Sequence, residues 1–465
     1  MTSTSLAPAA LTVPHDAAAL DAQLWPSSAR RNTEGALEVG GVSVQELARE
    51  FGTPLYVLDE AHLRTRASAV VTVFREAFAE IGAEAVVYYA GKAFLSAAVA
   101  RWVSEAGMRV DVCSGGELAL VLAAGVPAAA IGFHGNNKSA EEIARAVAAG
   151  VGAIVLDHPG EVEQVAAAAR TAGRVQAVRL RVNSGVHAST HDFLATAHED
   201  QKFGLPLDEA PAVVADIRRR PELNFLGLHC HIGSQIFGAA GFAESAARLL
   251  GLHEALLADG PVPELNLGGG FGVAYTPADE PTPIAELARE IAAIVAAECA
   301  ARGIALPVIA FEPGRSVIAQ STLTLYTAGA VKDVRVPAAN DAIRRYISVD
   351  GGMSDNARPA LYGAAYTVRL AGRVSTAEQR LIRLAGKHCE SGDILIDADY
   401  LPGDVGAGDL LAVPVTGAYC WALSSNYNFL VRPAVVAVAE GSARVIVRGE
   451  TEADLLARDA GLDGK

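Results

Sequence analysis

Short apolar runs alternate with alanine-rich runs along the middle of this chain. The apolar runs hold β-branched and aromatic residues and predict buried strands. In the alanine-rich runs, alanine and leucine recur at three- and four-residue spacing and a glycine follows, which is typical of helices. The apolar runs end near Ala90, Cys113, His134, Asp157, Asn183, His231, Gly268 and Glu312. Eight strand–helix units close a parallel barrel, so the sequence predicts a (β/α)8 TIM-like fold, with a doubly wound open sheet as the alternative.

The pattern changes on both sides of this region. Residues 1–24 are rich in alanine, serine, threonine and proline and predict a disordered tail. Beyond the last barrel unit, strands separated by Gly, Pro and Asp turns predict a second, mostly antiparallel β domain. We therefore expect the barrel over residues 56–322 and the β domain over residues 323–465, with residues 25–55 as its N-terminal segment.

The composition excludes several classes of protein. The 465 residues carry a formal net charge of −15, which argues against a nucleic-acid partner because such proteins need a basic face. No uninterrupted apolar stretch is long enough to span a membrane, and the N-terminus lacks a signal-peptide pattern. Five cysteines without metal-ligand spacing indicate a reducing compartment, no disulfide framework and no metal site. We expect a cytoplasmic protein.

Polar and charged side chains follow most of the predicted strands. Because the carboxyl ends of barrel strands meet at one face, where such barrels place their chemistry, these side chains predict a site. They are Lys92, Asp111, His134, Asp157, Arg181, His229, His231, Gly268 to Gly270, Glu312 and Arg315. A solvated strand end explains any one of them, but a single barrel face would bring the whole set together.

Three of these features predict the cofactor. Lys92 follows the apolar run VVYYA, and an amine at a barrel mouth is partly desolvated, which lowers its pKa and makes it nucleophilic. The glycine run in LNLGGGFG lets backbone N–H groups approach a phosphate, with Ser234 and Arg315 as further donors. Glu312 can hold a proton on a ring nitrogen. Together they indicate pyridoxal 5'-phosphate (PLP). Taken one by one, the alternative explanations are a surface lysine, a tight glycine turn and a local Glu312–Arg315 ion pair.

At these residues the sequence resembles the fold-type III PLP-dependent decarboxylases, whose barrel is like that of alanine racemase. The resemblance covers nearly everything after Trp25 and includes ordered motifs: YYAGKAF, HGNNKS, GLHCHIGSQ, NLGGGFG, FEPGR, GGMSDNARPALY, CESGD and GAYCWALSSNYN. Within that family it implies decarboxylation of meso-2,6-diaminopimelate to L-lysine, the last step of lysine biosynthesis.

The resemblance implies a role for individual residues. Lys92 would form the Schiff base with PLP, His231 would stack on the pyridine ring, Glu312 would pair with its nitrogen, and Cys389 would donate a proton. The residues implied at the cofactor are Lys92, Asp111, Arg181, His231, Ser234, Gly268, Gly269, Gly270, Glu312, Gly314, Arg315 and Tyr419. Those implied at the substrate are Arg315, Arg358, Tyr362, Glu390 and Tyr419. A homodimer is also implied, in which Cys389 and Glu390 reach the neighbouring subunit's site.

Some positions depart from the family's pattern, and other functions remain as alternatives. Ser184 stands where proline is common, Gln201 where serine is common, and the loop between them is rich in histidine (His187, His191 and His198). A decarboxylase of ornithine, arginine or carboxynorspermidine would share every PLP residue and differ in recognising the far end of its substrate. A non-catalytic PLP-binding homologue would have no need of Cys389, Glu390 and Arg358.

Overall fold

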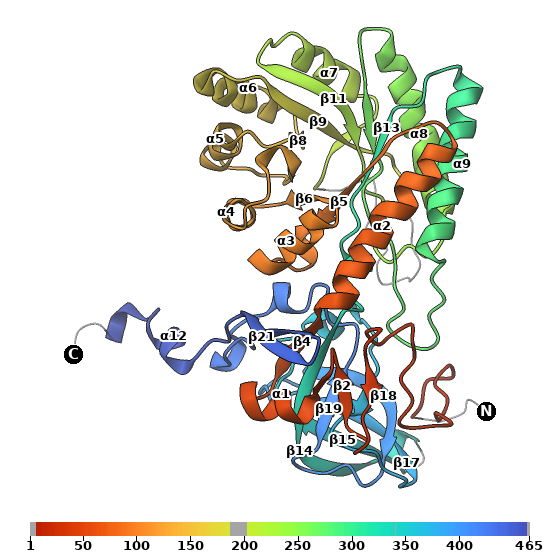
Figure 1. Ribbon diagram of the computed structural model, residues 1–465, viewed down its shortest axis with the longest axis vertical. Helices are drawn as coiled ribbons and strands as arrows, with labels where there is room; N and C mark the ends of the chain where they lie inside the picture. Colours follow the sequence, from red (N-terminus) through yellow and green to blue (C-terminus); the bar gives the residue numbers. More distant parts are fainter. Residues whose placement is uncertain (1–5, 187–201, 340, 463–465) are drawn as a thin grey trace. The chain divides into compact units, whose positions relative to one another are not determined.

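The computed structural model describes residues 6–186, 202–339 and 341–462 (Figure 1). Gln201, where the family commonly has serine, and the three histidines of the same loop lie outside the described residues. The chain divides into two compact units. One consists of Arg64–Val273 and Pro281–Val317, and the other of the residues up to Leu63, Ala274–Glu280 and the residues from Ile318 onward.

The first unit is the predicted barrel. Its strands are β5 (Ala85–Ala90), β6 (Arg109–Val112), β7 (Ile131–Phe133), β8 (Ala153–Leu156), β9 (Gln176–Asn183), β11 (Leu223–His229), β12 (Glu264–Asn266) and β13 (Val308–Phe311). Each pairs in parallel with its neighbours, and the β13–β5 and β8–β9 pairings close the ring. The short β10 (Leu205–Pro206) is added alongside β9. The closed ring confirms the (β/α)8 barrel and makes the open-sheet alternative wrong.

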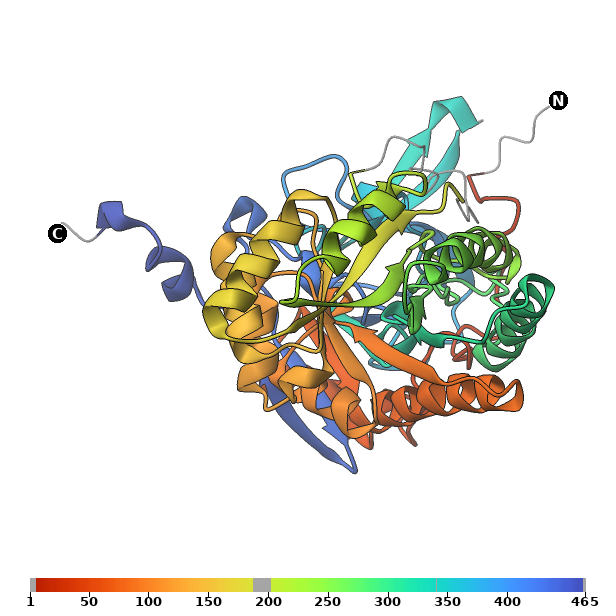
Figure 2. The ribbon, with the colours of Figure 1, turned by 90° about the horizontal axis from the view of Figure 1, so that it is seen from above.

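A helix follows each barrel strand, α2 precedes β5, and together these helices surround the strands (Figure 2). They are α2 (Glu60–Glu80), α3 (Ala97–Glu105), α4 (Gly115–Ala123), α5 (Ala140–Ala149), α6 (Gly160–Ala172), α7 (Ala210–Arg218), α8 (Ala240–Leu257), α9 (Ile284–Arg302) and α10 (Arg315–Ile318). Local sequence fixes their ends. The Ser139 hydroxyl caps α5 with Glu142 in a reciprocal capping box, and the left-handed Gly150 ends that helix.

A buried ion pair links three barrel strands. Arg179 of β9 is 1% exposed, and its guanidinium lies 2.6 Å from the Glu264 carboxylate of β12. The same guanidinium donates to the Tyr88 hydroxyl of β5 at 2.9 Å. Because an isolated buried charge is costly, the pairing with Glu264 and the bond to Tyr88 hold the three strands in one register.

The second unit is built on a mostly antiparallel sheet. Its strand order is β18 (Ile394–Pro402), β17 (Gln379–Ala385), β15 (Ala342–Val349), β14 (Thr322–Val336), β4 (Leu55–Asp59), β20 (Val435–Ala439) and β21 (Ser442–Val447), with β19 (Leu410–Val413) on β14 and β16 (Arg369–Leu370) on β19. Only the β15–β17 and β4–β20 pairings among these are parallel. The predicted second domain is therefore confirmed as a mostly antiparallel fold.

The smaller elements of this unit lie near the chain ends and in connections. The strands β1 (Arg30–Arg31), β2 (Leu37–Val39) and β3 (Val42–Ser43) form a separate sheet, and the helices are α1 (Val44–Phe51), α11 (Arg358–Tyr362) and α12 (Glu452–Leu456). Among the described residues, no helix has both the length and the apolar character needed to cross a membrane.

The boundary between the units differs from the one expected at residue 56. Strand β4 pairs with β14 and β20, so residues 56–63 belong with the β unit. All five β4 residues are buried, and such a run has the pattern of a barrel strand, which explains the misplacement. The disorder predicted for residues 1–24 stays a prediction; residues 6–29 lie in turns and irregular segments, and Leu24 is buried.

Candidate active site

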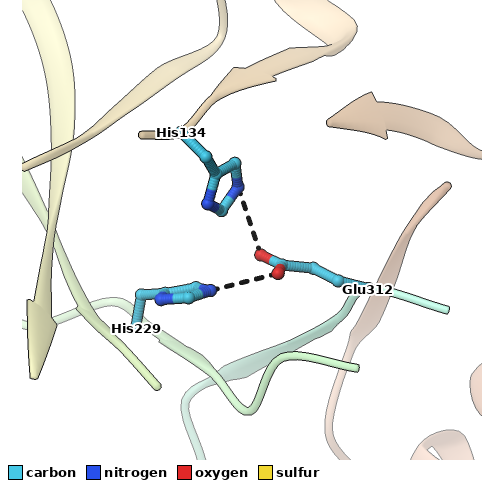
Figure 3. A group of neighbouring side chains, drawn as sticks. All are labelled: His134, His229 and Glu312. Carbon is cyan, nitrogen blue, oxygen red and sulfur yellow. Dashed lines mark hydrogen bonds and ion pairs between the residues drawn. The ribbon is translucent and has the colours of Figure 1, made fainter. Parts of the chain in front are cut away.

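A buried carboxylate lies where four barrel strands end. Glu312 follows β13, and its Oε2 lies 3.1 Å from His229 Nε2 at the end of β11. Its Oε1 accepts a hydrogen bond from Asn266 Nδ2 of β12 at 2.7 Å and lies 3.4 Å from His134 Nε2 after β7. Figure 3 shows both imidazoles pointing at the carboxylate. The barrel therefore surrounds one acid with nitrogen groups from three other strands.

Burial sets the charges in this cluster. It lowers the pKa of His134 and of His229 to about 4, so both rings are neutral at pH 7. Burial alone would raise the pKa of Glu312, but His229, His134 and Lys92 hold it well below its ordinary value. Glu312 is therefore the charged carboxylate of the cluster, and an anion held in this way can keep a proton on a ring nitrogen.

A second carboxyl group lies beside the first. Asp111 Oδ1 is 3.2 Å from His134 Nε2. Burial, with the charge of Glu312, raises the pKa of Asp111 well above its ordinary value. Two neighbouring acids in one apolar site do not both ionise, so Asp111 is the neutral member of the pair.

The glycine run after β12 is packed against neighbouring backbone. A Cβ on Gly269 would lie 2.1 Å from the Glu312 carbonyl oxygen, and one on Gly270 would lie 2.4 Å from the Gly233 carbonyl oxygen. Gly270 also has φ +106°, a conformation that other residues rarely adopt. Beside this run, Arg315 Nη2 donates to Ser234 Oγ at 2.9 Å. A tight glycine turn with a guanidinium nearby is suited to an anion such as a phosphate.

Lys92 lies in the single turn Gly91–Ala93 directly after β5. Its ammonium acts electrostatically on Asp111, His231 and Glu312, so it belongs to the same strand-end cluster. The residue is exposed in the described structure, and the desolvation of its amine at the barrel mouth stays a prediction. Glu312 is the charged carboxylate of the cluster that acts on this amine.

His231 and Arg181 complete the barrel part of the predicted set. Burial holds the pKa of His231 well below its ordinary value, and its Nδ1 accepts from Gly269 N–H at 3.4 Å, so the ring is neutral with its proton on Nε2. Arg181 lies 3.8 Å from Asp157 and 4.3 Å above the Phe203 ring. Gly314 lies close against Ala90, so a side chain at position 314 would clash with it.

Arg358 of α11 is a buried cation in the other unit. It is 5% exposed, and its guanidinium lies 4.6 Å from the Tyr275 ring and 5.5 Å from the Tyr366 ring, with a hydrogen bond to the Tyr366 hydroxyl. Among the described residues, no carboxylate lies within ion-pair distance of it. Since a buried charge without a counter-charge is costly, this arrangement is suited to binding an anionic group from outside the chain.

The remaining predicted residues also belong to this unit. Cys389 and Glu390 are exposed in the turn between β17 and β18, and Tyr362 is 45% exposed at the end of α11. Tyr419 has φ +63°, which is a strained backbone conformation for a tyrosine. Such strain is often found at functional positions. Because the two units are described separately, these four residues and Arg358 are not placed against the barrel cluster.

Sequence reasoning missed part of the Glu312 environment. It noted His134 and His229 at strand ends but gave neither a role, and it did not single out Asn266. The signal was present, since Asn266 lies two residues before the glycine run and its Oδ1 accepts from Gly268 N–H at 2.8 Å. An asparagine at a strand end, two residues before a glycine turn, organises that turn and donates to the neighbouring strand end.

The barrel and its strand-end cluster define a class of protein. Residues 67–319 match the family model described as the pyridoxal binding domain of pyridoxal-dependent decarboxylases. The chain is 49% identical over 442 residues to diaminopimelate decarboxylase of Mycobacterium tuberculosis, covering 93% of this chain and 97% of the relative. It is 43% identical to diaminopimelate decarboxylase of Bacillus subtilis, with 93% and 97% covered.

Solved structures agree with these relatives. Diaminopimelate decarboxylase from M. jannaschii in complex with L-lysine superposes with a TM-score of 0.86 at 30% identity, covering 94% of this chain and 98% of that one. This chain therefore belongs to the diaminopimelate decarboxylases of the pyridoxal-dependent decarboxylase family.

The family makes PLP the cofactor, and the described residues fit it. The charged Glu312 suits a protonated ring nitrogen, and the glycine run with Arg315 suits a phosphate. His134 Nε2 is a buried polar atom with no hydrogen-bond partner of good geometry among the described residues, which is consistent with a polar site that the polypeptide alone does not complete.

The two histidines predict a pH-dependent loss of stability. Their pKa is about 4 in the folded protein against 6.5 ordinarily, so the unfolded chain binds their protons first as the pH falls. The free energy of unfolding of the PLP-bound protein should fall between pH 6.5 and pH 4, by on the order of 3 kcal/mol for each histidine. His229→Asn keeps an N–H donor for Glu312 but does not titrate, so its decline should be shallower. Urea unfolding at a series of pH values measures both, and equal slopes for the two proteins would contradict this account.

Proposed function

We propose that this chain decarboxylates meso-2,6-diaminopimelate to L-lysine with PLP as cofactor. Its relatives of 43% and 49% identity are diaminopimelate decarboxylases, and the M. jannaschii structure of the same enzyme holds L-lysine. A decarboxylase of ornithine, arginine or carboxynorspermidine would share the barrel cluster, so the choice depends on how the far end of the substrate is recognised.

The observation that carries the choice of substrate is the buried Arg358. Diaminopimelate keeps a carboxylate at the end that does not react, and a guanidinium binds a carboxylate through two parallel hydrogen bonds. Tyr275 and Tyr366 pack their rings near this guanidinium without neutralising it. Ornithine has no distal carboxylate, so the buried charge of Arg358 would stay unpaired in a complex with ornithine.

The barrel residues have a distinct task in this proposal. PLP supplies an electron sink for the negative charge left at Cα when CO2 departs. Lys92 would hold the cofactor through its amine, and Glu312 would keep the ring nitrogen protonated so that the ring could accept that charge. The neutral His231 would pack on the ring. The phosphate would be held by Ser234, the glycine run Gly268–Gly270 and Arg315, with Asp111 and Arg181 as supports. Tyr419, from the other unit, is proposed as a further phosphate ligand.

Cys389 and Glu390 complete the site in this proposal. A thiol donates a proton near neutral pH, so Cys389 returns a proton to Cα, while Glu390 pairs with the distal ammonium of the substrate. We further propose a homodimer in which these two residues reach the neighbouring subunit's site. Its support is a set of exposed apolar residues in the same unit: Leu361 at 60%, Tyr362 at 45%, Tyr427 at 42% and Phe429 at 71%. A cytoplasmic location is part of the same proposal.

Borohydride trapping tests the lysine. Reduction of the PLP-bound protein should leave a pyridoxyl group on the peptide that contains Lys92, because reduction fixes the bond between amine and cofactor. Lys92→Ala should lose the label and the visible absorbance of the bound cofactor, and should convert no meso-diaminopimelate to lysine and CO2. Mass spectrometry of the digest reads the label, and a pyridoxyl group on another lysine would contradict the assignment.

Arg358→Met tests the choice of substrate. It keeps much of the side-chain volume and removes the charge, so kcat/KM for meso-diaminopimelate should fall by roughly 10⁴-fold. Arg373 is a matched control, because it pairs on the surface with Asp404 and Asp409, and Arg373→Met should keep kcat/KM within about twofold. Turnover of ornithine by the unchanged protein, with no lysine from diaminopimelate, would instead favour the ornithine alternative.

A further inference from the structure

The turn that carries Cys389 and Glu390 is fixed by a buried carboxylate. Asp393 Oδ2 accepts from His388 N–H at 2.9 Å and lies 2.8 Å from His388 Nδ1, while Oδ1 accepts from Met353 N–H at 2.6 Å. The two side chains are 0% and 2% exposed. The backbone closes the same turn, because Asp393 N–H donates to the Glu390 carbonyl. His388, directly before Cys389, is therefore held by both its backbone and its ring.

Close backbone contacts leave the Asp393 carboxylate little room to move. A Cβ on Gly386 would lie 2.1 Å from it, and one on Gly352 would lie 2.6 Å from it. Lys387 N–H also donates to the Gly351 carbonyl at 3.0 Å. The carboxylate thus joins the start of the turn to a second loop of the same unit.

A separate segment, Tyr427 and Asn428, also contacts the turn that carries Cys389. Asn428 Oδ1 accepts from Cys389 N–H at 2.9 Å, and the Tyr427 ring stacks on the His388 ring at 5.6 Å with an interplanar angle of 4°. Asn428 and the next residue, Phe429, both lie in the left-handed region, at φ +52° and +59°. Consecutive left-handed residues other than glycine are costly, at about 1–2 kcal/mol each. Such strain persists where surrounding contacts require it and is frequent at functional sites.

We propose that His388 and Asn428 are positioning residues that hold Cys389 from both sides, one through Asp393 and one through the Cys389 N–H. This inference rests on the proposed function, in which Cys389 donates a proton to Cα. A proton donor displaced by about 1 Å can lose a factor on the order of 10² in rate, so the rigidity of this turn controls the proton transfer. The strained Asn428 places its amide where an unstrained loop would not.

Asn428→Gly separates positioning from stability. Glycine adopts φ +52° without strain, so the melting temperature should not fall, but the acceptor for the Cys389 N–H is lost. We expect kcat of the PLP-bound enzyme with meso-diaminopimelate to fall by about 10- to 100-fold while KM changes by less than about threefold. The solvent deuterium isotope effect on kcat should rise, because proton transfer becomes more strongly rate-limiting. Asn428→Asp, which keeps the oxygen acceptor, should recover most of the lost rate.

The outcomes are distinguishable from failure of the proposed function. If Cys389→Ala decarboxylates diaminopimelate at the unchanged rate, the proposed proton donor is wrong and this inference fails with it. If Cys389→Ala is impaired but Asn428→Gly has the unchanged kcat and isotope effect, only the positioning role is overturned. A loss of kcat in Asn428→Gly that follows a lowered melting temperature, with no change in isotope effect, would also overturn it.

Discussion

The site depends on one carboxylate that stays ionised inside a barrel. Burial by itself would protonate Glu312, and a neutral acid there could not hold a proton on a neighbouring ring. The described structure keeps the charge by supplying nitrogen groups from three other strand ends, together with the nearby ammonium of Lys92. The second acid, Asp111, takes the neutral state, so the cluster carries one carboxylate charge rather than two. The barrel is what makes this possible, because it brings the ends of distant strands within hydrogen-bond distance.

Much of this could be predicted from the sequence, for physical reasons. Strand–helix repetition with glycine after the helices fixed the number of units, and a parallel barrel puts all carboxyl ends on one face. What failed were questions of environment. Strand β4 is buried on both faces in a β sheet, so its apolar sequence has the same pattern as that of a barrel strand. Lys92 follows a buried strand but is itself exposed, although Gly91 and Ala93 on either side of it in the same turn are buried. Asn266 was overlooked because an amide partner is decided by a neighbouring strand, which local sequence does not specify.

The β unit contributes a different kind of chemistry. In the proposed function its residues serve recognition: a guanidinium packed near two tyrosine rings, and a thiol and a carboxylate on a turn held by Asp393 and Asn428. In both units a charged or reactive group is positioned by polar contacts that local sequence patterns did not reveal. In the proposed function the two units therefore have separate tasks: the barrel controls the electronic state of the cofactor, and the β unit selects the substrate.

The protonation state of the cofactor's ring nitrogen tests the central claim most directly. The protein would be reconstituted with PLP labelled with ¹⁵N in the ring, and its nitrogen chemical shift measured by NMR across the pH range 6 to 9. The account predicts a protonated nitrogen throughout that range in the unchanged protein and an unprotonated one in Glu312→Gln, with a matching loss of decarboxylation. An unprotonated nitrogen in the unchanged protein, or the same shift in both proteins, would contradict it.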